Sequence, residues 1–163
     1  MNYARQTPRT LHEEHLASIT VLGRIEQLLL RPPARGALAD ALLEELRPLI
    51  RQIEQDVNRH FTFEETELFT PKGEAGEGDI AGLLAEEHGA IRAVAEDLLP
   101  LLRRAIERTL DGDGWDTLRR DALELVERQV SHIQKEQMAL LPMLDDLLDE
   151  ETDGRLALAY ASA

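Results

Sequence analysis

The chain has 163 residues, no cysteine, five histidines and a formal net charge of -14, from 32 acidic and 18 basic residues. The lack of cysteine excludes disulfides, thiolate zinc sites, cysteine-ligated iron–sulfur clusters and a cysteine nucleophile. The acidity argues against a nucleic-acid-binding surface and against docking on anionic membranes, because both of these need basic patches.

The length suits one domain with a sizeable core, so we expect residues 1–163 to form a single domain. No apolar stretch reaches the roughly 20 residues that a transmembrane helix needs. The N-terminal residues lack the apolar core of a signal peptide. A cytoplasmic location is therefore the expectation.

Four long segments carry apolar residues three and four positions apart, which is typical of helices with one buried face. Clusters of Pro, Gly and Asp separate them, and these residues favour turns. The predicted helices cover about residues 10–31, 37–69, 79–110 and 115–149. Short loops between long helices favour antiparallel neighbours, so the predicted fold is all-α, an up-down-up-down four-helix bundle.

Two further features concern the helices themselves. Pro48 and Pro100 fall inside predicted helices and should kink them, because each removes a backbone hydrogen bond. In the tail, residues 150–163, the stretch from Asp153 to Tyr160 can form a short fifth helix. This tail is also a candidate contact for a protein partner.

An internal repeat relates the first predicted helix pair to the second, as for a duplicated αα-hairpin. Near their starts, the first and third predicted helices carry the same three residues, Glu-Glu-His, which end at His15 and His88. The second and fourth helices each contain His-x-x-x-Glu, with 72 residues between the two copies: His60 with Glu64, and His132 with Glu136. Four of the five histidines thus occupy matched positions, one in each helix.

Histidine and glutamate four residues apart lie on one helix face, so four such faces can bring four imidazoles and two carboxylates together inside a bundle. A single histidine of this kind is more often a solvated or capped group. Burying the whole set without partners costs on the order of 1–3 kcal/mol or more for each unpaired group. A bound metal removes this cost. Without thiolates, nitrogen and oxygen ligands suit iron, manganese or zinc, and six ligands suit a dinuclear centre better than a tetrahedral zinc site.

This ordered set of motifs resembles the hemerythrin-like, or HHE cation-binding, domain family over about residues 10–149. The segments that carry the resemblance are His15, His60-Phe-Thr-Phe-Glu64-Glu-Thr-Glu-Leu-Phe, Glu87-His88, and His132-Ile-Gln-Lys-Glu136 with Leu141-Pro142. The resemblance implies a non-haem site of two iron ions with an oxo or hydroxo bridge, for which manganese or zinc are possible substitutes. It further implies the following ligands: His15 and His60 for one iron, His88 and His132 for the other, and Glu64 and Glu136 as bridges.

One departure from the family pattern affects the expected function. Oxygen-carrying hemerythrins have a second histidine on the third helix, four residues before His88, where this chain has Leu84. One iron then has an open position, which argues against reversible oxygen carriage and favours redox chemistry or sensing. His12 could replace the missing ligand, but its counterpart in the repeat is Ala85, so we interpret it as a solvated histidine.

Several residues near these motifs have two possible roles. Glu14 and Glu87 are expected to cap helices or face solvent, with orientation of an imidazole as the alternative. Arg92 and Lys135 are expected to face solvent, although either could reach an anionic ligand. Six apolar residues are expected to surround the site: Ile19, Phe61, Phe63, Leu68, Ile91 and Leu140.

The sequence therefore predicts a di-iron protein that handles oxygen, peroxide or nitric oxide. Its expected partner is such a small molecule, not nucleic acid or a membrane. The alternatives are an iron- or oxygen-responsive sensor or iron-handling protein without turnover, and a structural bundle with adventitious metal. The pattern leaves open whether the protein is an enzyme and how many chains associate.

Overall fold

The computed structural model describes residues 2–30, 37–70 and 79–163, and these residues form helices without any strand. The elements are α1 (Gln6–Leu30), α2 (Ala37–Gln55), η1 (Asp56–His60), α3 (Phe61–Phe63), η2 (Glu64–Leu68), α4 (Asp79–Ile106), α5 (Gly112–Lys135), η3 (Glu136–Leu140), α6 (Leu141–Leu147) and α7 (Glu150–Ala161). The predicted all-α class is thereby confirmed.

The elements α2 to η2 follow one another without a break and form the second long helix, and α5 to α6 likewise form the fourth. In each of these helices a π-helical turn begins at the glutamate of the His-x-x-x-Glu motif, over Glu64–Leu68 and Glu136–Leu140. Such turns are rare and occur frequently at functional sites. The internal repeat therefore extends from the sequence to the backbone.

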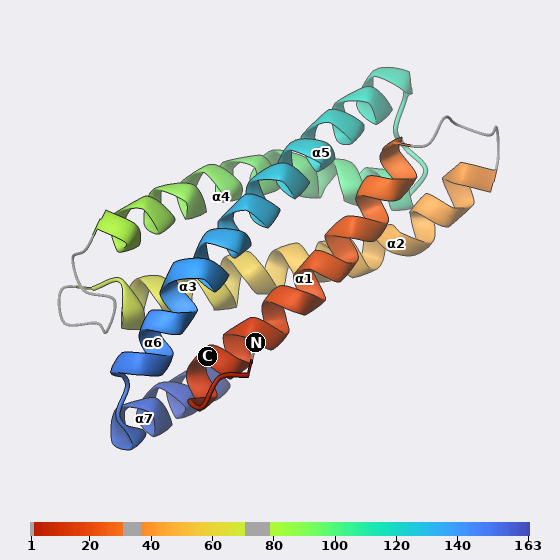
Figure 1. The fold of residues 1–163 in the computed structure, drawn as a ribbon. Helices are drawn as coiled ribbons and strands as arrows, with labels where there is room; N and C mark the ends of the chain where they lie inside the picture. Colours follow the sequence, from red (N-terminus) through yellow and green to blue (C-terminus); the bar gives the residue numbers. More distant parts are fainter. Residues whose placement is uncertain (1, 31–36, 71–78) are drawn as a thin grey trace.

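The long helices pack side by side. α1 contacts α2 and α5, and α4 contacts the same two helices, so that each lies next to two others. The colours in Figure 1 run in opposite directions along successive long helices. Two apolar clusters fill the bundle, one containing Phe61 and Ile91 and the other containing Leu11, Leu84 and Leu140.

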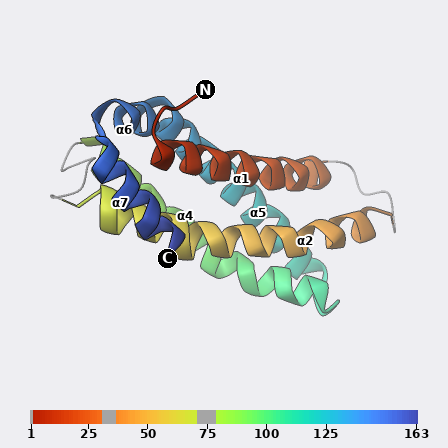
Figure 2. The same cartoon turned by 90° about the horizontal axis from the view of Figure 1, so that it is seen from below.

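The C-terminal residues form the fifth helix that the sequence predicted. α7 lies beside the first turns of α1, as Figures 1 and 2 show from two sides. The backbone of Leu148 is extended, and Asp149 caps α7 by accepting a hydrogen bond of 2.7 Å from the Thr152 N–H. For this reason the fourth helix ends at Leu147 and not at the predicted residue 149.

Helix boundaries differ from the predicted ones because of caps and turns that the apolar periodicity does not show. α1 begins at Gln6 because the Asp153 carboxylate accepts hydrogen bonds from the backbone N–H groups of Gln6 (2.7 Å) and Thr7 (2.8 Å). α4 ends at Ile106, shortly before Arg108 with its positive φ of 58°. Asp111 then caps α5 through the Gly114 N–H.

The two internal prolines interrupt neither helix. Pro48 lies within α2 and Pro100 within α4, and both helices continue past them, while the expected kinks stay a prediction. In the described ranges, no helix combines the length and apolarity needed to cross a bilayer.

The cap that α7 provides predicts a loss of stability in Asp153→Ala. Burial alone would raise the pKa of Asp153, but the hydrogen bonds from Thr7 and Gln6 outweigh burial and hold it below its usual range. Its contribution, about 1 kcal/mol, is therefore complete above the usual carboxyl pKa and is lost as the pH falls through the lowered value.

Thermal unfolding of the two forms at several pH values measures this effect. We expect Asp153→Ala to melt below the wild type at pH 7 and the difference to shrink in acid. The same change at the exposed Asp146 serves as the control. A difference that stayed constant down to strong acid would contradict a cap made by the ionised carboxylate.

Candidate metal centre

Four buried histidines, one from each long helix, meet in the interior of the bundle. His15 lies on α1, His60 ends η1, His88 lies on α4 and His132 on α5, and each is at most 3% exposed. They form two pairs. The Nε2 atoms of His15 and His60 are 3.2 Å apart, and those of His88 and His132 are 2.9 Å apart.

Two fully buried glutamates lie between the pairs. Glu64 Oε1 is 3.3 Å from His60 Nε2, and its Oε2 is 3.3 Å from His88 Nε2. Glu136 Oε2 is 2.8 Å from His15 Nε2, and its Oε1 is 3.0 Å from His132 Nε2. Each carboxylate thus reaches both histidine pairs. The six residues form two ligand groups that share Glu64 and Glu136, and the ligand atoms of each group lie within 4.8 Å of one another.

The electrostatics of the cluster favour positive charge beside the two glutamates. Burial would lower the pKa of His60, but the charge of Glu64 and the hydrogen bond to Glu14 outweigh burial and raise it. Burial would raise the pKa of Glu136, but the charge of His132 and contacts with His15 outweigh burial and lower it. Without a metal, protons on His60 and His132, whose pKa values are both raised, supply part of this charge.

The same atoms fit a metal ion. None of the four carboxylate oxygens of Glu64 and Glu136 accepts a well-directed hydrogen bond from the described residues, although each carboxylate lies at ion-pair distance from histidine nitrogens. Buried carboxylate oxygens without donors are costly unless a cation compensates for them. Imidazole and carboxylate donors suit a divalent transition metal. The buried cluster is therefore compatible with metal binding.

A second set of carboxylates, which we call the outer carboxylates, contacts the far side of three imidazoles. Glu14 lies 3.1 Å from His60 Nδ1, Glu65 lies 2.9 Å from His88 Nδ1, and Glu87 lies 3.0 Å from His132 Nδ1. Ionised carboxylates only accept hydrogen bonds, so in each pair Nδ1 donates. Nε2 then faces the cluster, where a metal can take the place of a proton.

Each outer carboxylate has a partner of its own. Arg92 donates two hydrogen bonds to Glu65, at 2.6 and 3.0 Å, and Lys135 Nζ lies 2.5 Å from Glu87. Burial would raise the pKa of both glutamates, but these cations outweigh burial and hold it below its usual range. The structure thus supports the alternative interpretation of Glu87, in which it orients an imidazole. Arg92 and Lys135, which were expected to face solvent, bind Glu65 and Glu87.

The partner of Glu14 comes from the C-terminal helix. The Tyr160 hydroxyl donates a hydrogen bond to Glu14 Oε2, and Gln55 Nε2 donates one of 3.3 Å to Oε1. Arg59 in turn lies 4.6 Å from the centre of the Tyr160 ring and donates a hydrogen bond to the Tyr160 carbonyl oxygen. Burial and the contact with Glu14 both raise the pKa of Tyr160, which therefore stays a neutral donor.

Asp56 is a further buried carboxylate near the cluster. It lies one turn before His60 and accepts hydrogen bonds from Ser18 Oγ (2.9 Å), Gln52 Nε2 (2.9 Å) and Gln129 Nε2 (3.1 Å). Sequence reasoning missed it, although Asp56, His60 and Glu64 follow one another at intervals of four residues. That spacing was a usable signal, because it places all three side chains on one helix face.

The remaining predicted residues lie as follows. His12 is half-buried and contacts Gln137, with 3.3 Å between His12 Nδ1 and Gln137 Nε2, and it belongs to neither ligand group. Leu84 is fully buried. Phe61 stacks on His88 with ring centres 3.8 Å apart. Of the six apolar residues expected around the site, Ile19 is half-buried and five are buried: Phe61, Phe63, Leu68, Ile91 and Leu140.

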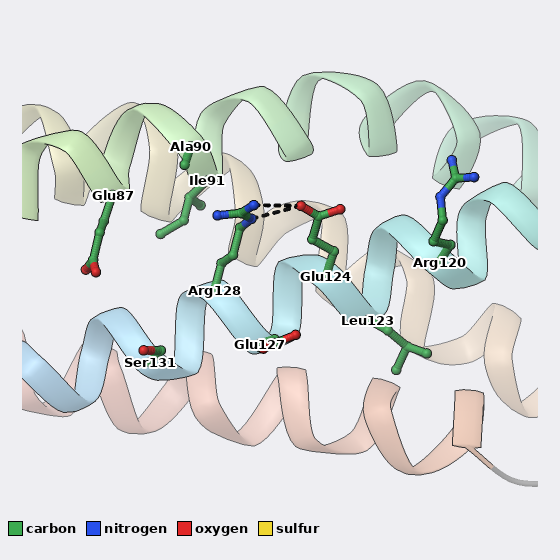
Figure 3. Close-up of a pocket in the computed structure, with 9 residues that line it drawn as sticks. All are labelled: Glu87, Ala90, Ile91, Arg120, Leu123, Glu124, Glu127, Arg128 and Ser131. Carbon is green, nitrogen blue, oxygen red and sulfur yellow. Dashed lines mark hydrogen bonds and ion pairs between the residues drawn. The ribbon is translucent and has the colours of Figure 1, made fainter.

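A surface groove of about 650 Å³ between α4 and α5 lies next to the cluster. Figure 3 shows Glu87 at one end of it, Arg120 at the other, and the Glu124–Arg128 ion pair between them. Glu87 lines the groove and also contacts His132, so the groove reaches one of the outer carboxylates. Ile91, which is 2% exposed, forms part of its wall.

An all-α bundle with a buried histidine–glutamate cluster is typical of helical metal-binding proteins. The family model described as the hemerythrin HHE cation-binding domain matches residues 7–144. The chain therefore belongs to the hemerythrin HHE cation-binding domain family. A search of curated proteins found no match to the chain.

The surroundings of Asp56 predict a pH-dependent gain of stability in Asp56→Asn. Burial raises the pKa of Asp56 and outweighs the charge of His60 and the hydrogen bonds from Gln52 and Ser18. A raised carboxyl pKa means that the folded state loses stability as the pH rises from the usual value through the raised one.

We expect Asp56→Asn to melt above the wild type at pH 7.5, and the two to converge in acid, where the carboxyl is protonated. Differential scanning calorimetry of the metal-free protein measures this, with Asp97→Asn, at an exposed position, as the control. A variant that melted below the wild type at every pH would show that the hydrogen bonds of the carboxylate outweigh its desolvation.

The contact between Tyr160 and Glu14 predicts weaker metal retention in Tyr160→Phe. Loss of the hydroxyl removes the donor that holds Glu14 against His60. Removing such an outer contact typically costs 10–100-fold in metal affinity, and a tenfold loss is the expectation here. Competition with a chelator measures the affinity. Tyr3→Phe is the control, because Tyr3 packs against His12, which belongs to neither ligand group. Equal retention in both variants would contradict a role for α7 at the site.

Proposed function

We propose that this protein is a non-haem di-iron protein of the hemerythrin-like type. In this proposal His15 and His60 hold one iron, His88 and His132 hold the other, and Glu64 and Glu136 bridge the two. The observation that carries the proposal is that both buried carboxylates are shared between the two ligand groups. A mononuclear site would not need a second histidine pair at the same carboxylates.

The number of protein ligands supports reaction with a small molecule. Each iron would receive two imidazoles and two shared carboxylates, which is fewer than the six ligands of an octahedral ion. Bound iron would supply open coordination positions and redox chemistry for oxygen, peroxide or nitric oxide. Leu84 offers no donor where oxygen-carrying hemerythrins have a histidine, so we propose redox handling of such a ligand rather than reversible oxygen carriage.

The chain's own residues would prepare the site for this chemistry. The outer carboxylates hold three imidazoles in the tautomer that binds metal. Phe61, Leu84 and Leu140 are fully buried, and an apolar wall of this kind limits the access of water. A small molecule would approach from the groove beside Glu87, the outer carboxylate that contacts His132.

A second candidate function is a sensor or iron-handling protein without turnover. The observation that favours it is the chain of contacts from His60 through Glu14 to Tyr160 on α7. Through these contacts, the occupation of the site would change the packing of the C-terminal helix. A partner that recognises this helix could then respond to iron.

The proposal predicts about two irons per chain in protein produced with sufficient iron, measured by elemental analysis and the visible spectrum. His60→Ala should lower the iron content, because it removes a ligand of one iron, whereas His12→Ala should leave it unchanged. Because metal binding stabilises the folded state, the iron-loaded wild type should also melt above the metal-free form. Reconstituted protein with less than about 0.3 metal ions per chain would rule out the di-iron proposal.

Turnover separates the two candidate functions. If the protein is an enzyme that decomposes peroxide, the iron-loaded chain should release oxygen over many cycles, and Glu64→Ala should abolish the release. An oxygen electrode measures it, with free iron at the same concentration as the control. A single stoichiometric oxidation would instead favour the sensor or binding function.

A further inference from the structure

The outer carboxylates are an incomplete set. His60, His88 and His132 each have a carboxylate at Nδ1, which is the nitrogen that faces away from the cluster. His15 is 2% exposed and turns its Nε2 towards Glu136 and His60 in the same way. Its Nδ1, however, is buried and has no hydrogen-bond partner in the described part of the chain.

The internal repeat identifies the substitution responsible. Glu65 directly follows the shared ligand Glu64 and contacts His88. At the matched position after Glu136 the chain has Gln137, which contacts His12 instead of His15. One carboxylate of the expected symmetric set is thus replaced by an amide.

The cation that holds the outer carboxylate is also missing on this side. Arg92, four residues after His88, binds Glu65 with two hydrogen bonds. Four residues after His15 the chain has Ile19, which has no charge. Both parts of the Glu65–Arg92 pair are therefore absent beside His15.

From this asymmetry we propose that the two metal positions have unequal affinity, with a tight position at His88 and His132 and a weak one at His15 and His60. A carboxylate at Nδ1 fixes the imidazole ring and its tautomer and makes Nε2 a better donor. Loss of such a contact typically lowers metal affinity 10–100-fold. The weak position then fills last and empties first. This inference rests on the proposed dinuclear site and adds an order of loading to it.

The matched positions allow a reciprocal test on the full-length chain. The probe is Zn²⁺, titrated into metal-free protein in competition with a chromophoric chelator. We expect two binding steps in the wild type, separated by about 10–100-fold. Gln137→Glu should strengthen the weaker step, and Glu65→Gln should weaken the tighter one, so that each variant brings the two steps closer together.

Two further variants assign the steps, and one controls for charge. His15→Ala should remove the weaker step and His88→Ala the tighter one. Gln134→Glu adds the same charge at an exposed position on the same helix and should leave both constants unchanged. Glu65→Gln keeps the test decisive if Gln137→Glu does not fold.

Two steps of equal affinity in the wild type would overturn the inference and leave the dinuclear site intact. A shift of less than twofold in both reciprocal variants would also overturn it. Failure of the wild type to bind a second zinc or iron ion would instead contradict the proposed function, and the order of loading with it. The two failures are therefore distinguishable in one titration.

Discussion

The structure depends on the burial of two carboxylates, Glu64 and Glu136, at the centre of the helix bundle. An isolated buried carboxylate costs several kcal/mol, so two of them at one place require compensating positive charge. Protons on His60 and His132, or a metal ion bound by the four histidines, supply this charge. The bundle supports this arrangement by taking one histidine from each long helix and by placing apolar layers on both sides of the cluster.

A further layer of charged and polar groups surrounds the buried histidine–glutamate cluster. Negative outer carboxylates orient the imidazoles, and Arg92, Lys135 and Tyr160 hold these carboxylates in turn. From the centre outward, acceptors and donors thus alternate: carboxylate, imidazole, carboxylate and an outer donor, which is a cation at Glu65 and Glu87 and the neutral Tyr160 hydroxyl at Glu14. Tyr160 extends this order to α7, whose Asp153 also caps α1. The C-terminal helix therefore contacts the bundle at two places, the N-terminal end of α1 and the histidine–glutamate cluster.

The sequence predicted the fold and the cluster because both depend on short spacings. The 3.6-residue period located the helices, and His-x-x-x-Glu, repeated after 72 residues, located the residues that the structure brings together. The boundaries at Gln6 and Leu147 differed from the prediction because Asp153 and Asp149 supply the caps, and neither cap follows from the periodicity.

The outer carboxylates were harder to predict for a geometric reason. Glu14 and Glu87 each precede a histidine in sequence, but neighbouring residues point about 100° apart on a helix, so neither reaches its own neighbour. Each reaches the histidine of the adjacent helix instead, His60 or His132. Tyr160 lies 146 residues from Glu14. Contacts between such distant residues depend on the packing of whole helices, which local patterns do not specify.

The most direct test of the shared dinuclear site is a crystal structure of the iron-loaded protein with anomalous scattering recorded at the iron edge. We expect two anomalous peaks, one beside His15 and His60 and one beside His88 and His132, with Glu64 and Glu136 bound to both. A single peak, or two peaks that do not share these carboxylates, would contradict it.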